Sequence, residues 1–216
     1  KVFEINRNFR NEGISLMHNP EFTMIEFYEL YRDFNDYMKL TEELLSALGR
    51  EMLSDGNIQW QGQKISMAPP FKRVKFMEAI AEKSGLAVEQ LWDEGQVGGH
   101  IRKHFPEEPV PPTFGKMLEL LFDFYVEKAL VEPTFVTYYP KAISPLSKAS
   151  RLDDRETERF ELYIAGMEIA NGFSELNDPL EQRRRFEEQV RDRERGDDEA
   201  QRIDNGFLQA LEHGMA

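Results

Sequence analysis

The sequence predicts an α+β fold in which helices flank a mostly antiparallel sheet. Two charged strand–loop–strand segments, over residues 9–28 and 158–177, indicate antiparallel hairpins. Because the strands come as charged hairpins and not as strand–helix–strand units, a doubly wound architecture is disfavoured. With 216 residues and 40% hydrophobic content, the chain is long enough for one or two domains with a sizeable core.

Composition excludes several classes of protein. The chain has no cysteine, which rules out disulfides and cysteine metal sites and favours an intracellular setting. No apolar stretch is long enough to span a membrane. A net charge of −13 argues against a general nucleic-acid binder, but not against an enzyme whose nucleic-acid contacts lie in another domain. The chain starts at Lys1 without a methionine and stops without an evident terminator, so we expect a fragment of a longer chain.

The first hairpin combines a strand over residues 1–10, a polar loop and a return strand from Thr23 to about Phe34. Alternation on the return strand places an aromatic ring, a thioether, a carboxylate and a phenol in one row. That row is formed by Phe22, Met24, Glu26 and Tyr28. The other polar side chains gathered by the hairpin are Arg10, Glu12, His18 and Asn19.

A helix follows, capped by Asn35 or Asp36 and ending near Leu53. The next segment, residues 55–130, is expected to be a helical insertion between parts of the sheet. It begins with a small hairpin over residues 58–67 and continues with short helices around residues 79–80, 88–91 and 97–101. A last, apolar helix is capped by Thr113.

Two histidines in this insertion raise the question of a metal site. His100 and His104 have the i, i+4 spacing that suits a metal on one helix face. No third ligand is evident nearby in the sequence, which favours the interpretation that both are surface histidines.

The third part, residues 131–216, contains a strand over residues 133–140, the second charged hairpin and two helices. Asp178 followed by Pro179 is a strong helix start, and this helix is expected to run through Glu194. Its dense charges are typical of a solvated helix face. A last helix is expected over about residues 205–213.

The second hairpin carries the carboxylates of interest. Alternation puts Asn171, Phe173 and Glu175 on one face, whereas Glu168 has the wrong parity unless a bulge near residues 169–171 resets the face. We predict that bulge. A turn centred on Ile164–Ala165 would place Glu161 opposite Glu168.

Two carboxylates about 5 Å apart would repel by about 3 kcal/mol at an effective dielectric constant of about 20. A divalent cation would reverse the sign of that interaction. Two exposed glutamates beside a turn are the alternative, and spacing alone leaves both interpretations open.

The residues of the two hairpins lack a nucleophile. There is no cysteine, no serine in a nucleophile-elbow motif, no Walker loop and no dinucleotide-binding glycine pattern. Acyl transfer through a covalent enzyme intermediate is therefore disfavoured. These side chains suit the binding of charged ligands. The cationic side chains can bind phosphate and carboxylate groups, and the acidic side chains can bind a divalent ion and an ammonium group.

Several short sequence motifs resemble those of one known family. RNEG, HNPEFT and the Glu-x-Tyr pair lie in the first hairpin, and PTF, SPL, GFSELNDP, RFEEQ and GDDEA follow in order. In these motifs the chain resembles the class II aminoacyl-tRNA synthetases and, within that class, the lysyl-tRNA synthetases. The resemblance covers residues 1–55 and 130–216. It implies a class II synthetase-like antiparallel sheet flanked by helices, with residues 1–216 forming part of a catalytic domain.

The resemblance also implies an activity and its partners. Lysine would be activated by ATP to lysyl-adenylate and then transferred to tRNA(Lys), with Mg²⁺ as cofactor, in a cytoplasmic enzyme that is a homodimer at full length. The third signature motif, with its ATP clamp, is not present, so we expect the fragment itself to be inactive. Two alternatives are a synthetase-like paralog that lysylates a translation-factor protein and a non-catalytic synthetase-like regulator.

Roles for individual residues follow from the same resemblance. Arg10 would bridge the lysine carboxylate and the α-phosphate and is the implied catalytic residue. The residues implied to bind ATP are Arg10, Glu12, His18, Asn19 and Phe22. The residues implied to hold Mg²⁺ are Glu161 and Glu168. The residues implied to bind lysine are Glu26, Tyr28, Asn171, Phe173 and Glu175.

Overall fold

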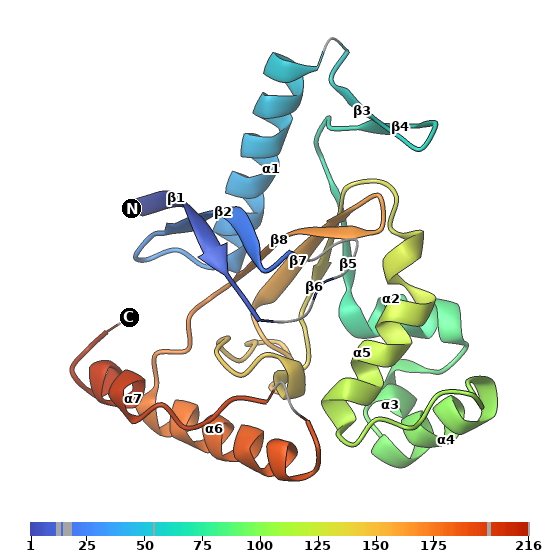
Figure 1. The fold of residues 1–216 in the computed structure, drawn as a ribbon, viewed down its shortest axis with the longest axis vertical. Coiled ribbons are helices and arrows are strands. Elements are labelled where there is room, and N and C mark those ends of the chain that lie inside the picture. Colours follow the sequence, from blue (N-terminus) through green and yellow to red (C-terminus); the bar gives the residue numbers. More distant parts are fainter. Residues whose placement is uncertain (12–13, 15–18, 54, 198–199, 216) are drawn as a thin grey trace. The chain divides into compact units, whose positions relative to one another are not determined.

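The structure is a computed structural model that describes all residues except 12–13, 15–18, 54, 198–199 and 216 (Figure 1). It divides into two compact units, Lys1–Arg32 and Asp33–Ala216, and each is described by itself. The first unit is the predicted hairpin, in which β1 (Val2–Phe9) pairs antiparallel with β2 (Glu21–Tyr28). The second unit holds all the helices of the described residues.

The expected length of the return strand is wrong. It ends at Tyr28 instead of reaching about Phe34, because Asp33 already starts the next helix, α1 (Phe34–Met52). The Asp33 side chain accepts from the backbone N–H groups of Asn35 and Asp36, and the Asp36 side chain accepts from the backbone N–H of Asp33. This reciprocal capping box places the cap at Asp33 and not at Asn35 or Asp36.

A four-stranded sheet lies in the centre of the second unit. Three of its strands are antiparallel neighbours, which confirms the mostly antiparallel α+β prediction, and one outer strand runs parallel to its neighbour. That outer strand, β5, was missed because its sequence KRVK shows no apolar alternation. In spatial order the strands are β5 (Lys72–Lys75), β6 (Thr134–Thr137), β7 (Arg159–Ile164) and β8 (Met167–Phe173).

Helix α1 packs on one face of this sheet. Its Phe34 and Met38 are buried in the same cluster as Phe135 and Phe160, and the Phe135 and Phe160 rings meet edge to face at 5.3 Å. The backbone N–H of Phe34 donates to the Ser174 hydroxyl at 3.1 Å, which ties the start of the helix to the end of β8. This apolar face leaves the opposite face of β7 and β8 for polar side chains.

A helical layer packs near the opposite face of the sheet. The Phe76 and Phe122 rings stack at 4.8 Å, and Val136 and Tyr163 of the sheet belong to the same buried cluster. Thr113 caps the last of these helices through the backbone N–H of Lys116, as predicted. The helices are α2 (Phe76–Ser84), α3 (Val88–Leu91), α4 (Glu94–His104) and α5 (Phe114–Tyr125).

The remaining elements are a small hairpin, two short 3₁₀ turns and a helix pair. The hairpin β3 (Asn57–Trp60) and β4 (Gln63–Ser66) confirms the predicted one and turns at residues 61–62, both with positive φ. The 3₁₀ turns are η1 (Glu127–Ala129) and η2 (Lys141–Ile143). In the part of the chain that the structure describes, every helix is too short or too polar to cross a bilayer.

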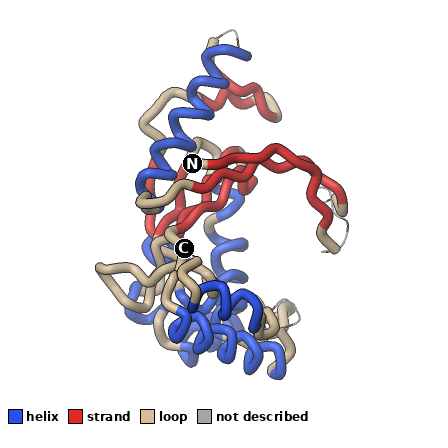
Figure 2. The backbone as a smooth tube through the Cα atoms, turned by 90° about the vertical axis from the view of Figure 1, so that its left-hand side faces the viewer, coloured by secondary structure: helices blue, strands red, loops and turns tan. Residues whose placement is uncertain are grey.

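The two C-terminal helices, α6 (Pro179–Glu194) and α7 (Asn205–Glu212), lie side by side (Figure 2). Asp178 caps α6 through two backbone N–H groups, which confirms the predicted start. Most charged side chains of α6 are solvated, but Arg185 is buried and donates to the carbonyl oxygens of Ser144 and Ser147. The expectation of a solvated charged face therefore holds only in part.

The structure corrects the prediction that both histidines of α4 lie on the surface. His104 is exposed, but His100 is buried and its Nε2 lies 3.0 Å from the Tyr125 hydroxyl. The two imidazole rings stack at 4.2 Å. Burial, and then the neighbouring His104, lowers the pKa of His100. His100 is thus part of the α4–α5 packing and not a surface residue.

Candidate active site

The turn between β7 and β8 sets the register of the site. Ala165 and Gly166 both have left-handed backbone conformations, with φ of 56° and 69°. Ile164 therefore pairs with Met167, and Tyr163 pairs with Glu168. The predicted turn at Ile164–Ala165 is wrong by one residue. Since Glu168 faces Tyr163 across the strands, Glu161 and Glu168 are not cross-strand neighbours, and the repulsion expected for that pair does not apply.

The predicted bulge is confirmed. The register shifts so that Leu162 pairs with Ala170 and Glu161 pairs with Asn171, which leaves Ile169 without a partner in the ladder. A bulged residue breaks the two-residue alternation, so Glu168 joins Asn171 on the face that carries Glu161. The site is therefore built from one face of two strands.

The buried carboxylate of Glu161 is the most constrained group on this face. Only 7% of the residue is exposed. Its Oε2 accepts hydrogen bonds from the phenols of Tyr139 at 2.7 Å and Tyr163 at 2.6 Å. Burial, and then the Glu161 charge, raises the pKa of both phenols, so they remain protonated and donate. The other oxygen, Oε1, accepts from the Arg159 guanidinium.

Arg159 is a residue of the site that the sequence reasoning missed. Its Nε donates to Asn171 Oδ1 at 3.2 Å, and its Nη1 donates to the Ile143 carbonyl at 2.6 Å and the Ser144 hydroxyl at 3.0 Å. The guanidinium also lies 4.6 Å from the centroid of the Tyr139 ring. Its position two residues before Glu161 on the same strand was the available signal.

The remaining predicted residues of this hairpin are more open. Glu168 and Asn171 are exposed and Phe173 is half-buried. Glu175 lies just beyond the end of β8, where its backbone pairs with Ser147. Its side chain reaches solvent, and desolvation by nearby protein atoms raises the pKa of its carboxyl. The structure thus brings Glu161, Asn171 and Phe173 together with Glu168 on one face, with Glu175 next along the chain.

This donor set fits Mg²⁺. No group of three or more His, Cys, Asp or Glu side chains able to hold a metal occurs among the described residues. Mg²⁺ is commonly held by one or two carboxylates and completed by substrate phosphates and water, so Glu161 and Glu168 are the side chains of this face that would hold it. Oε2 of Glu161 accepts from two phenols and Oε1 accepts from Arg159 alone, so Oε1 is the oxygen with acceptor capacity left for a metal ion.

The hairpin in the first unit positions the other predicted group. The Arg10 guanidinium lies 5.5 Å from the centroid of the Phe22 ring, and the Arg10 backbone N–H donates to the Pro20 carbonyl. Asn19 is exposed. Glu12 and His18 lie outside the described residues.

The lysine-binding residues predicted in this hairpin lie near a further carboxylate. The Tyr28 hydroxyl lies 3.4 Å from the Glu26 carboxylate. Glu4 pairs directly with Glu26 across the two strands. Like charges at directly opposite positions destabilise a hairpin and favour a bound cation. Sequence reasoning missed Glu4, because only the register reveals this pair.

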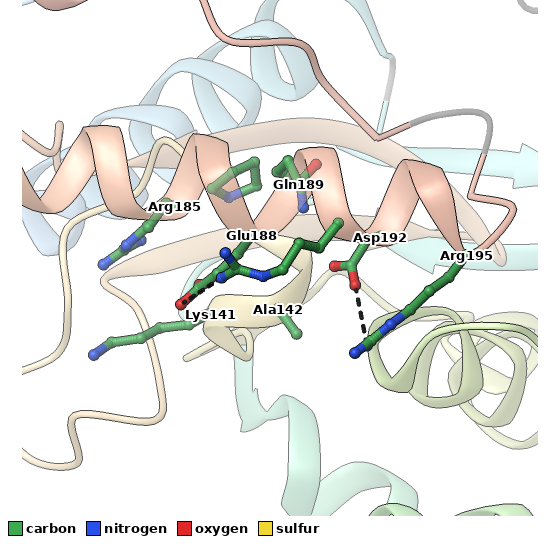
Figure 3. Close-up of a pocket in the computed structure, with 9 residues that line it drawn as sticks. Lys141, Ala142, Arg185, Glu188, Gln189, Asp192 and Arg195 are labelled. Carbon is green, nitrogen blue, oxygen red and sulfur yellow. Dashed lines mark ion pairs between the residues drawn. The ribbon is translucent and has the colours of Figure 1, made fainter.

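A small polar cavity lies elsewhere in the second unit. It has a volume of about 190 Å³ between α6 and η2 (Figure 3). Within it, Arg191 pairs with Glu188 and Arg195 pairs with Asp192. None of the predicted site residues lines it. The candidate site is therefore the face of β7 and β8 that carries Glu161 and not this cavity.

A comparison with known proteins identifies the protein family of the chain. Over residues 1–216 the chain matches the family model "tRNA synthetases class II (D, K and N)". The chain therefore belongs to the class II aminoacyl-tRNA synthetases.

The similar curated proteins include several lysine–tRNA ligases. Among them are the lysine–tRNA ligases of Shouchella clausii, 48% identical over 215 residues, and of Bacillus subtilis, 44% identical over 218 residues. A third is the lysine–tRNA ligase of Pelotomaculum thermopropionicum, 46% identical over 221 residues. Each match covers 100% of this chain, and the chain spans 43% of the length of each relative.

Proposed function

We propose that this chain forms part of the catalytic domain of a lysine–tRNA ligase, which activates lysine with ATP and transfers the lysyl group to tRNA(Lys). The observation that carries the proposal is the face of β7 and β8 on which a buried Glu161, held by two phenols and Arg159, lies with Glu168 and Asn171. The curated relatives over the whole chain support the amino-acid assignment.

The chemistry needs positioned charges and no protein nucleophile. The lysine carboxylate attacks the α-phosphate of ATP in line, the bond to the bridging oxygen breaks, and pyrophosphate leaves with that oxygen. Arg10 places the carboxylate and the α-phosphate together and offsets their charges. Glu161 and Glu168 would hold Mg²⁺, which supplies positive charge to the phosphates when bound.

In this proposal the ATP base is assigned to the first hairpin. Phe22 offers one ring face for the adenine, and the cation–π contact with Arg10 keeps the guanidinium beside that ring. Glu12, His18 and Asn19 complete the ATP-binding set in this proposal. The contact between Arg10 and Phe22 supports it, because it joins the residue for the α-phosphate to the residue for the base.

Selectivity for lysine would come from carboxylates that need the ε-ammonium as their counter-charge. Glu26, Tyr28 and Glu175 would receive the ε-ammonium, and Asn171 and Phe173 would line the pocket. A carboxylate that loses water on closure of the site without gaining an ammonium raises the energy of the complex, so neutral or shorter side chains are rejected. Nearby protein atoms raise the pKa of Glu175, a direction that agrees with a carboxyl at the edge of a pocket.

Lysine-dependent exchange of pyrophosphate into ATP tests the proposal in the full-length protein that carries this chain. Glu175→Gln keeps the shape of the side chain but removes its charge, and we expect exchange to fall by about a hundredfold or more because the ammonium loses its counter-charge. Glu212→Gln, at the end of α7, is the matched control and should leave the rate unchanged. Unchanged exchange in Glu175→Gln would remove the pocket assignment.

A further inference from the structure

We infer that Arg159 is a positioning residue that couples the metal-holding carboxylate to the amino-acid pocket, an inference that rests on the proposed function. The guanidinium contacts Glu161 and Asn171 at the same time. These two residues serve different ligands, Mg²⁺ and lysine. One rigid cation therefore determines the orientation of a side chain in each subsite.

The rigidity of Arg159 comes from how its donors are used. All three nitrogens of the guanidinium donate, to Glu161, to Asn171 and to the Ile143 carbonyl with the Ser144 hydroxyl. The ring of Tyr139 covers its flat face. Only 17% of the side chain is exposed. Contacts on both the edge and the face of a guanidinium hold it in one orientation.

The contact with Asn171 fixes which way the amide is turned. A guanidinium only donates, so the atom of Asn171 that faces Arg159 must be the carbonyl oxygen Oδ1. The amino group Nδ2 is then turned away from Arg159 and is presented as a donor. A donor in the amino-acid pocket suits the lysine carboxylate, whereas a reversed amide would present an acceptor and repel it.

The contact with Glu161 has the opposite consequence for a metal ion. Arg159 uses one acceptor position of Oε1 and neutralises the carboxylate, while the two phenols fill Oε2. A second cation at Oε1 is repelled by the guanidinium. Arg159 thereby weakens Mg²⁺ binding in the absence of substrates and favours binding together with the ATP phosphates, which add negative charge.

These two contacts predict effects of opposite sign when the positive charge is removed. In Arg159→Gln the amide of Asn171 is no longer oriented, so the dissociation constant for lysine should rise by about tenfold or more. Glu161 gains a free acceptor and loses its counter-charge, so the dissociation constant for Mn²⁺, used as a probe for Mg²⁺ without nucleotide, should fall by about threefold to tenfold. A residue that only supports the fold would weaken both.

The test measures both constants on the full-length protein that carries this chain, by calorimetry for lysine and by Mn²⁺ titration. Arg155→Gln is the control, because Arg155 pairs with Asp153 and lies over Trp92 without touching the site. Arg159→Lys keeps the charge but not the fork, and should retain the wild-type Mn²⁺ affinity while binding lysine more weakly. It also serves if Arg159→Gln does not fold.

The possible outcomes distinguish a failure of the coupling through Arg159 from a failure of the proposed function. Opposite shifts in Arg159→Gln, with Mn²⁺ affinity retained in Arg159→Lys, support the coupling. Wild-type protein that binds lysine, combined with parallel losses or no change in the variants, overturns the coupling alone. Wild-type protein that does not bind lysine overturns the proposed function and the coupling with it.

Discussion

Gly172 controls how closely β8 lies against the aromatic core, and Gly172→Ala tests this directly. A Cβ at this position would lie 2.6 Å and 2.8 Å from two ring carbons of Phe160. Phe160 is 2% exposed and packs edge to face on Phe135, so its ring cannot move aside without disturbing the core. The substitution is therefore overpacking, with an expected cost of about 1–3 kcal/mol in the free energy of unfolding.

The same substitution should reach the site. Gly172 lies between Asn171 and Phe173, so any outward shift of β8 moves these two residues of the proposed lysine pocket away from β7. We expect weaker lysine binding together with the loss of stability. Urea unfolding measures the stability, and calorimetry of lysine binding measures the effect on the site, both on the full-length protein.

A control and a rescue define the result that would refute this reasoning. A Cβ on Gly99 meets nothing within 4 Å in helix α4, so Gly99→Ala should leave stability unchanged or raise it by about 0.5–1 kcal/mol. Adding Phe160→Leu to Gly172→Ala makes room for the methyl group, so the double variant should lose less than the sum of the single changes. Strictly additive losses, or Gly172→Ala as stable as the wild type, would contradict the overpacking argument.

Two further predictions concern the buried Glu161 and the raised pKa of Asp123. Tyr163→Phe removes one of the two phenols that donate to the buried Glu161, so it should lower the free energy of unfolding by about 1.5–3 kcal/mol. The control Tyr28→Phe changes an exposed phenol and should alter the free energy of unfolding by well under 1 kcal/mol. Equal losses of the two variants in urea unfolding would contradict this prediction. Desolvation, followed by Glu127 and Glu119, raises the pKa of Asp123 to about 6. The folded state thus holds this proton longer than the unfolded state, and stability falls as the pH rises from about 4 to 6. Asp123→Asn should therefore raise Tm relative to the wild type above pH 6 and not below pH 4, and calorimetry showing the same difference at both pH values would refute the assignment.

Much of the fold could be predicted because local signals were strong. Asp178–Pro179 and Thr113 start their helices as capping residues do, and the turn at residues 61–62 ends in a glycine. The bulge at Ile169 was predictable from the odd spacing of Glu168 and Asn171. In each case the information lies within a few residues of the feature.

The features that the sequence did not predict all depend on contacts between segments that are distant in the chain or lie on opposite strands. Strand β5 exists because β6 offers it a parallel partner, which the sequence KRVK does not reveal. The register of the second hairpin was misjudged by one residue because the left-handed pair Ala165–Gly166 forms the turn, and Gly166 was the overlooked signal. Arg159 and Glu4 were missed because their importance depends on what lies across the strand.

The hydrogen bonds around Glu161 have a consequence for the entropy of ligand binding. A free arginine or glutamate side chain gives up on the order of 1.5–2 kcal/mol of rotamer freedom when it is fixed. Here the two phenols, the serine hydroxyl and the backbone carbonyl fix Glu161 and Arg159 while the protein folds. The loss of freedom therefore belongs to folding, and a substrate that arrives at this face meets side chains that are already ordered.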